Sequence, residues 1–255
     1  MTTRANPTTR FSSRVDNYVK TRPGYPEELI PLLEKCCDLT PQAVVADIGF
    51  GTGLSTLPFL QYGNRVYGVE PNKEMRQAGE AFLRRYKNFV SVVGTAEYTK
   101  LPNKSMDYII AGQAFHWFNR VEARKEFLRV LKPGGTVALI WNDRKTDATP
   151  FLQAYEKLLV EFSTDYREVN HRNIDEKVIA EFFAPKTFAT ASLPYAQHFN
   201  YERLEGRLMS SSYAPDVGHP QYEPMLKKLR EIYDTHQVND SVTFDYDTLI
   251  YYGKL

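Results

Sequence analysis

Residues 40 to 143 alternate short apolar runs with amphipathic stretches, a pattern that predicts strands connected by helices. The apolar runs are expected to form strands at 43–48, 65–69, 90–93, 106–111 and 137–141. A helix is expected at 54–61, after a glycine turn, and another at 120–131, where apolar side chains recur on one face. Pro71 suits the first position of a further helix, because its missing N–H would be unpaired there anyway. Strands alternating with helices favour an α/β fold with a parallel sheet.

From residue 144 onward the chain becomes richer in helix signals and aromatic residues. Helices are expected at 151–162, 176–183, 202–211 and 223–236, and strands at 189–199 and 242–252. No linker or internal repeat interrupts the chain, so we expect one domain over 1–255 with a helical cap after the fifth strand. The expected parts are a helical cover at about 1–40, a ligand-binding core at 41–143, cap and substrate regions at 144–187 and 201–237, and a final strand at 241–255.

A glycine-rich turn follows the first expected strand, and an acidic residue follows the second. The turn is Asp47-Ile48-Gly49-Phe50-Gly51-Thr52-Gly53, and the acid is Glu70. Ligands of parallel sheets bind outside the carboxyl ends of the strands, where an acid accepts hydrogen bonds from ribose hydroxyls. A dinucleotide fingerprint would have a small residue at Leu54, and a phosphate-binding loop would have Lys after Gly53. The pattern therefore indicates a nucleoside ligand but disfavours NAD, FAD and a cradled triphosphate.

Asp47 to Gly53 and Glu70 resemble, residue for residue, the first two motifs of the class I S-adenosylmethionine-dependent methyltransferases. Thr95-Ala96-Glu97 is similar to the adenine-binding turn of that family, although Thr95 stands where Asp is frequent. Leu131-Lys132-Pro133-Gly134-Gly135 also matches a frequent companion of the fold, in the methyltransferase type 11 group. The resemblance implies S-adenosylmethionine as cofactor and a Rossmann-like sheet of seven mostly parallel strands, with helices on both faces and the last strand antiparallel.

The N-terminal segment carries a second, narrower resemblance. Phe11 to Tyr18 and Arg22-Pro23-Gly24-Tyr25-Pro26 are similar to a stretch that folds over the cofactor in methyltransferases like trans-aconitate methyltransferase. By this resemblance Tyr18 and Arg22 close the site, and Arg22 pairs with a carboxylate of the cofactor or of an acidic substrate. The alternative is that Arg22 caps a helix while Tyr18 packs beneath the cover.

Gln113-Ala114-Phe115-His116-Trp117-Phe118 follows the fourth strand, at the end that lies beside the transferable methyl group in this family. His116 is the candidate general base, since the unperturbed pKa of histidine is about 6.5. Phe115, Trp117 and Phe118 are expected to line the substrate pocket with it. The alternative is that the aromatic rings are packing and His116 only fixes a loop. The resemblance places the following residues at the cofactor: Tyr18, Arg22, Asp47, Gly49, Gly51, Gly53, Glu70, Pro71, Thr95, Ala96, Glu97 and Gln113.

Composition and charge limit the kinds of partner that we expect this protein to bind. Lys and Arg number 32 against 31 Asp and Glu, so no global basic field exists for gripping nucleic acid. No apolar run approaches the length that spans a bilayer, and no secretory signal begins the chain, so we expect a cytoplasmic protein without a membrane partner. Cys36 and Cys37 are adjacent, which gives no metal-binding spacing; we expect core thiols of a helix and no metal site.

Two functions from different classes remain open. The first is a methyltransferase acting on a small molecule, at a carboxylate or a hydroxyl group, and the second is a non-catalytic or regulatory protein that binds S-adenosylmethionine. They differ at residues 113–118, which must border an open cavity in an enzyme. A methylase of RNA or protein is a further alternative that the near-zero net charge of +1 disfavours. The oligomeric state does not follow from the sequence.

Overall fold

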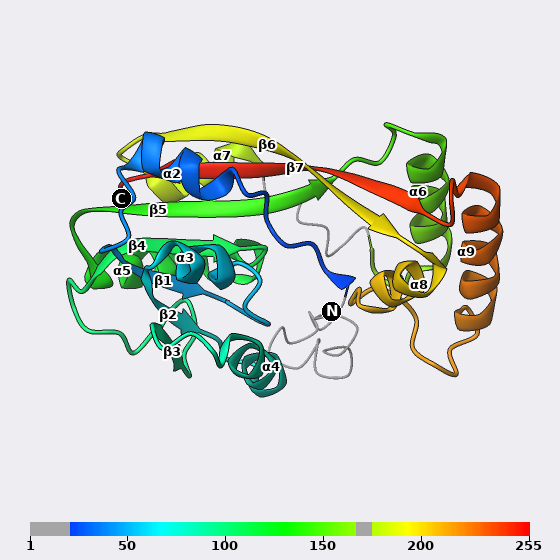
Figure 1. The fold of residues 1–255 in the computed structure, drawn as a ribbon. Helices are drawn as coiled ribbons and strands as arrows, with labels where there is room; N and C mark the ends of the chain where they lie inside the picture. The colour runs from blue at the N-terminus through cyan, green and yellow to red at the C-terminus, as the bar shows by residue number, and fades with distance from the viewer. Residues whose placement is uncertain (1–20, 167–174) are drawn as a thin grey trace.

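The structure is a computed structural model that describes residues 21–166 and 175–255. Its centre is one sheet of seven strands in the order β3-β2-β1-β4-β5-β7-β6 (Figure 1). The strands are β1 (Val44–Ile48), β2 (Arg65–Val69), β3 (Phe89–Val92), β4 (Met106–Gly112), β5 (Leu131–Arg144), β6 (Phe188–Phe199) and β7 (Val242–Gly253). β1 to β5 pair in parallel, whereas β7 is antiparallel to both β5 and β6. The predicted Rossmann-like sheet with an antiparallel last strand is confirmed.

Burial along the strands follows from this arrangement. β1 and β4 are buried almost without interruption, as expected for parallel strands that have helices on both faces. β7 alternates buried and half-buried positions, which is typical of a strand with one covered face. The α-helices of the described residues are α2 (Leu29–Cys37), α3 (Thr56–Tyr62), α4 (Lys73–Leu83), α5 (Arg120–Val130), α6 (Pro150–Phe162), α7 (Glu176–Phe183), α8 (Tyr201–Met209) and α9 (Tyr222–His236).

Two apolar clusters hold helices against the sheet. One joins α2 and α3 to one face through side chains such as Leu33 and Phe59. The other joins α5 and α7 to the opposite face through Phe127, Ile179 and Phe182. The placement of α7 differs from the expected cap region at 144–187, because the Arg124 side chain on α5 donates hydrogen bonds to the carbonyls at the end of α7. α7 therefore belongs to the sheet layer.

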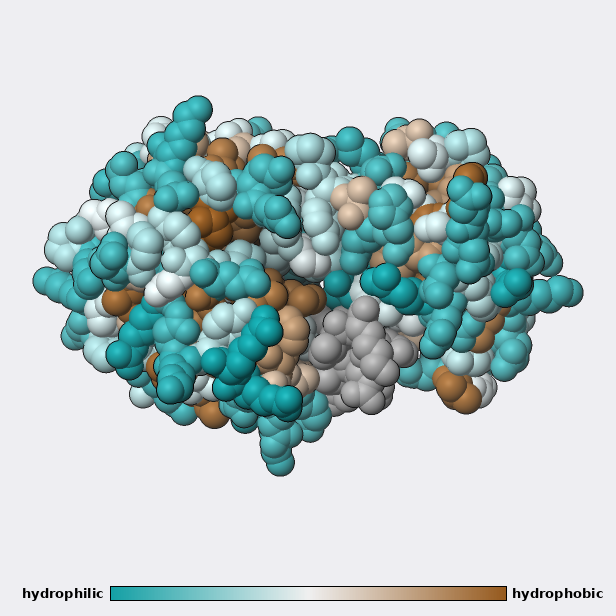
Figure 2. All heavy atoms as spheres, in the orientation of Figure 1, coloured by the Kyte–Doolittle hydropathy of each residue, from teal (hydrophilic) through white to brown (hydrophobic). Residues whose placement is uncertain are grey.

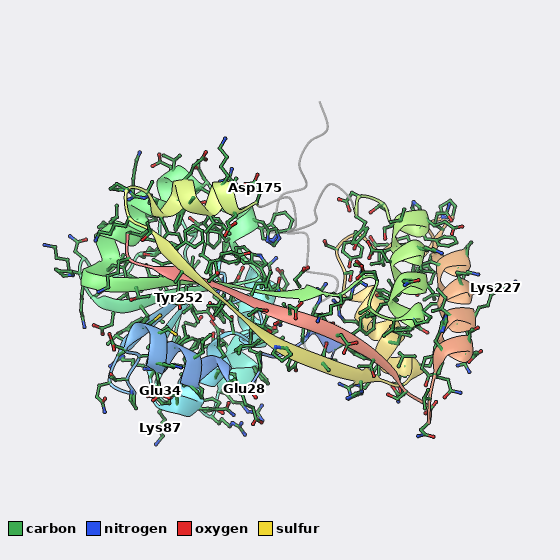
Figure 3. The ribbon with its side chains drawn as sticks, turned by 90° about the horizontal axis from the view of Figure 1, so that it is seen from above. Glu28, Glu34, Lys87, Asp175, Lys227 and Tyr252 are labelled. Atoms are coloured by element: carbon green, nitrogen blue, oxygen red, sulfur yellow. The ribbon has the colours of Figure 1, made fainter. Side chains whose placement is uncertain are left out.

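A third apolar cluster forms a separate helical lobe, which we define as α6, α8, α9 and the distal ends of β6 and β7. Its core contains Tyr155, Leu208, Leu229 and Phe244, contributed by each of these helices and by β7. Figures 1 and 3 show the lobe at the far end of the long strands β5 to β7, away from α2, α3 and α5. Lys227 on α9 points outward from it in Figure 3.

The length of β5 differs from expectation, and the difference shapes the site. Its apolar run predicts a strand at 137–141, but pairing with β7 continues from Val137 to Arg144. The β6–β7 ladder is twelve residues long and offers a partner strand beyond the apolar run. Asn142, Asp143 and Arg144 are thereby held in extended conformation between the sheet and the helical lobe.

α4 begins at Lys73, with the Asn72 side chain accepting a hydrogen bond from the backbone of Met75, so Pro71 precedes the helix and is not its first residue. Cys36 is exposed and Cys37 half-buried, which corrects the expectation of core thiols.

Within the described residues no helix is long and apolar enough to cross a membrane, and no cluster of metal-binding side chains occurs. The face seen in Figure 2 is largely hydrophilic, with hydrophobic residues in scattered patches.

Candidate cofactor and substrate site

A cavity of about 320 Å³ lies between the carboxyl ends of the parallel strands and the helical lobe. Its size falls in the range of small-molecule sites. One end is lined by the loops after β1, β2 and β3, and the other by the end of β5 together with residues of the lobe. Twelve of the residues singled out by sequence line it: Arg22, Gly49, Gly51, Glu70, Pro71, Thr95, Ala96, Glu97, Gln113, His116, Trp117 and Phe118.

The glycine turn between β1 and α3 requires residues without a side chain. Gly49, Gly51 and Gly53 all have positive φ, at 75°, 54° and 89°. A Cβ atom on Gly49 would lie 2.7 Å from the Cβ of Ala114, and one on Gly53 would lie 2.7 Å from a methyl group of Leu83. Gly49 and Gly51 border the cavity, whereas Gly53 packs the turn against α4. The turn thus brings backbone to the cavity wall that no side chain covers.

Glu70 follows β2 and fixes this turn. One of its carboxylate oxygens accepts a hydrogen bond from the backbone N–H of Gly51 at 3.0 Å, and the other accepts one from Asn72 at 2.9 Å. Burial raises the pKa of Glu70, while the amides of Asn72 and Gly51 and the charge of Arg76 oppose the rise. The carboxylate keeps further lone pairs for hydroxyl donors at the cavity wall.

Asp47 lies beneath the turn and does not border the cavity. It is fully buried, and its Oδ2 accepts hydrogen bonds from the hydroxyls of Ser55 and Thr56, both at 2.7 Å. Burial raises its pKa to about 6, against the effect of the two hydroxyls, and the nearby charge of Glu70 raises it further. Asp47 therefore joins β1 to the start of α3.

The segment after β3 forms a turn closed by hydrogen bonds between Thr95 and Tyr98. The Thr95 hydroxyl accepts a hydrogen bond from the Tyr98 backbone N–H at 3.2 Å and keeps its own proton for donation. Glu97 accepts a hydrogen bond from the backbone N–H of Asn119 at 2.8 Å, which ties the turn to the start of α5. Ala96 is buried at the cavity wall.

Residues 113–118 split between the cavity and the core. Gln113 adopts a left-handed φ of 57°, and its side chain donates to the carbonyl of Asn142 at 3.3 Å. The following 3₁₀ turn directs His116 and Trp117 to the cavity, with ring centroids 4.8 Å apart. Phe115 is fully buried, with its ring centroid 4.8 Å from that of Phe182, so its expected position in the substrate pocket is wrong.

The N-terminal segment reaches the helical lobe. Arg22 borders the cavity and donates hydrogen bonds to the Ser210 hydroxyl and carbonyl, both at 3.0 Å. Arg22 therefore ties the residues before α2 to the end of α8. Tyr18, the other residue predicted to close the site, lies outside the described residues.

Sequence reasoning missed the wall that the lobe and the end of β5 provide. Asn142, Asp143 and Arg144 continue a buried strand, and polar residues at a strand's carboxyl end are a signal that was present. Arg207 lies in the buried stripe of α8 with Leu204 and Leu208, and a charge within an apolar stripe was a second signal. The remaining members of this wall are Thr146, Tyr166, Ser212, Tyr213 and Tyr246.

The turn end of the cavity fits a nucleoside ligand. The Thr52 hydroxyl is buried at the wall without a hydrogen-bond partner, beside the glycine backbone that a Cβ atom would obstruct. The family model that matches residues 46–139 is described as a methyltransferase domain. The match includes the glycine turn, Glu70 and residues 113–118, and it identifies a methyltransferase domain in this part of the chain. The cofactor of this family is S-adenosylmethionine.

Relatives agree with this match. An uncharacterized methyltransferase of Mycobacterium tuberculosis is 38% identical over 136 residues, which cover 52% of this chain and 52% of the relative. The chain thus spans about half the length of these mycobacterial relatives. An uncharacterized methyltransferase of Schizosaccharomyces pombe is 28% identical over 94% of this chain and 95% of its own.

The fold also matches solved structures. A proposed type II methyltransferase of Anaeromyxobacter dehalogenans aligns with a TM-score of 0.67 and 21% identity, covering 91% of this chain and 97% of its own. This likeness confirms the Rossmann-like methyltransferase fold. The resemblance to the trans-aconitate methyltransferase group stays a prediction.

Proposed function

We propose that this protein transfers a methyl group from S-adenosylmethionine to a small molecule held in the cavity, at a carboxylate or a hydroxyl group. The observation that carries the proposal is the continuity of one cavity from the glycine turn to the helical lobe, past His116 and Trp117. A ligand at the turn and a second ligand against the lobe would meet beside residues 113–118.

The proposed cofactor residues are those that border the turn end of the cavity. Glu70 would accept hydrogen bonds from the ribose hydroxyls while its other lone pairs hold the amides of Gly51 and Asn72. The backbone at Gly49 and Gly51 and the hydroxyls of Thr52 and Thr95 would surround the rest of the cofactor. S-adenosylmethionine supplies an electrophilic methyl group on a positively charged sulfur.

The protein's own contribution is alignment and exclusion of water, since methyl transfer is an in-line displacement. A carboxylate acceptor needs no base. A hydroxyl acceptor benefits from one, and His116 is the candidate that borders the cavity. Trp117 and Phe118 would form an aromatic wall that favours the positive sulfur.

The alternative is a protein that binds S-adenosylmethionine without turning over a substrate. Such a protein has no need of a cavity beyond the cofactor, so the wall formed by His116, Trp117 and Phe118 favours the enzyme. A methylase of RNA or protein is disfavoured by the net charge of +1.

Calorimetric titration with S-adenosylmethionine and S-adenosylhomocysteine tests the proposal. We expect micromolar binding by the wild type, weakened by about 1–3 kcal/mol in Glu70→Ala because partners of the carboxylate are left unpaired. Glu80→Ala is the matched control, because it removes an exposed carboxylate from α4. The proposal is wrong if neither ligand binds the wild type. Turnover is then sought as S-adenosylhomocysteine released in the presence of carboxylic acids and phenols, and binding without release for any acceptor favours the alternative.

A further inference from the structure

Arg207 is a buried cation at the cavity wall. The residue is 7% exposed, and its side chain lies on the buried face of α8. Its Nη1 donates a hydrogen bond to the Ser211 hydroxyl at 3.2 Å, whereas its Nε is buried without a hydrogen-bond partner. No ion pair joins Arg207 to a carboxylate anywhere in 21–166 or 175–255. The guanidinium stays charged at every accessible pH, so its burial is costly until an anion is beside it.

Arg144 lies on the same cavity wall but, unlike Arg207, has a carboxylate partner. Its guanidinium forms an ion pair with Glu156 of α6, and Tyr166 donates a hydrogen bond to the same carboxylate at 2.9 Å. The charge of Arg144 is therefore balanced within the protein. No carboxylate of the described residues balances the charge of Arg207 in this way.

The guanidinium of Arg22 lies close to the same hydroxyl group as that of Arg207. Arg22 donates from Nη2 to the Ser211 hydroxyl at 3.4 Å, so both arginines converge on one neutral oxygen. Like charges repel most strongly where water is scarce, and an anion between them would remove the repulsion.

The carboxylates of the cavity wall are largely committed elsewhere. Glu70 accepts hydrogen bonds from Gly51 and Asn72 at the turn end, and Glu97 accepts one from Asn119. Asp143, at the end of β5, is the third carboxylate of the cavity wall. None of the three is joined to Arg207 by a hydrogen bond in the described structure.

We propose that Arg207 selects the methyl acceptor by binding an oxyanion of it, a carboxylate or a phosphate, with Arg22 adding a second positive charge. The proposal rests on the proposed function, because it places the acceptor at the lobe end of the same cavity. Neutral acceptors of equal shape would leave Arg207 without a counter-charge and would bind poorly.

The test measures anion binding directly, on the full chain with and without saturating S-adenosylhomocysteine, at constant ionic strength. The probes are glutarate, its uncharged analogue glutaramide, and inorganic phosphate. The variants are Arg207→Met, Arg207→Lys and the control Arg203→Met, which removes an exposed arginine from the same helix.

We expect glutarate or phosphate to raise the Tm of the wild type while glutaramide does not. Arg207→Met should bind the effective anion at least tenfold more weakly, Arg207→Lys should retain part of the affinity, and Arg203→Met should match the wild type. Arg207→Met should also fold as well as the wild type without anion, since it removes an unbalanced buried charge; if it does not fold, the comparison with Arg207→Lys replaces it.

Three results would overturn the proposal. The first is that neither anion binds the wild type, and the second is that binding is unchanged in Arg207→Met and Arg207→Lys. The third is that Arg207→Met weakens S-adenosylhomocysteine tenfold, because Arg207 would then hold the cofactor's own carboxylate. A wild type that binds anions through Arg207 but never binds S-adenosylhomocysteine refutes the proposed function alone.

Discussion

Glu70 accepts a hydrogen bond from the backbone N–H of Gly51 at 3.0 Å, so the acid after β2 holds the turn after β1 in place. Its other oxygen holds the N–H of Asn72, at the start of α4. One carboxylate thus shapes two of the loops that border the cavity. It also presents its lone pairs to whatever the cavity contains.

This relationship predicts that even the isosteric change Glu70→Gln weakens the cofactor. An amide has one acceptor oxygen, so its NH₂ group would face one of the two backbone donors. We expect S-adenosylhomocysteine affinity to fall by about 1–3 kcal/mol by calorimetry. Glu80→Gln, on the exposed side of α4, should have no effect. Wild-type affinity in Glu70→Gln would show that the paired acceptors are unimportant.

Gly49→Ala should destabilise the protein more than Gly134→Ala. Both glycines have positive φ, 75° and 82°, and an alanine there costs about 1 kcal/mol in backbone strain. A Cβ on Gly134 meets nothing within 4 Å, whereas one on Gly49 would lie 2.7 Å from Ala114. Urea unfolding should show a further loss of about 1–3 kcal/mol for Gly49→Ala. Equal losses in the two variants would mean that the close approach to Ala114 is relieved at no cost.

Asp47 should contribute a pH dependence of opposite sign to that of a salt-bridged acid. Its pKa is raised from 3.8 to about 6 by burial, so between these pH values the folded state binds more protons than the unfolded state. The contribution of Asp47 to stability therefore falls as pH rises from about 4 to about 6, by about 3 kcal/mol in total.

Asp47→Asn cannot ionise and removes this slope. The difference in unfolding free energy, variant minus wild type, should therefore rise with pH over that window, whatever its value at pH 4. Chemical denaturation at four or five pH values measures the difference. A difference independent of pH would show that the Asp47 carboxyl titrates alike in both states.

Phe115→Ala should destabilise the protein more than Phe118→Ala, because Phe115 lies in the core and Phe118 lies at the cavity wall. Phe115 is fully buried among Phe182 and Trp141, and its truncation should cost about 3–5 kcal/mol of unfolding free energy. Phe118 is half-buried at the cavity wall and should lose less stability. Denaturant midpoints at constant slope provide the comparison. Similar losses would place both rings in the same environment.

Local patterns in the sequence were sufficient for much of the fold. The strand Arg65–Val69 and the helix Glu176–Phe183 occur at the predicted residues, because apolar periodicity and flanking turn residues act over a few positions. Pairing between distant strands is a longer-range effect, and it extended β5 to Arg144 beyond its apolar run.

The sequence by itself determined the glycine turn, the acid after the second strand and the class of cofactor, because each depends on residues adjacent in the chain. Only the tertiary structure decided that α7 covers the sheet and that Phe115 turns into the core while its neighbour His116 borders the cavity. Only it brought Arg207 together with Arg22 and the end of β5. Those positions depend on packing between segments that lie 58 residues apart or more in the chain, which no local pattern encodes.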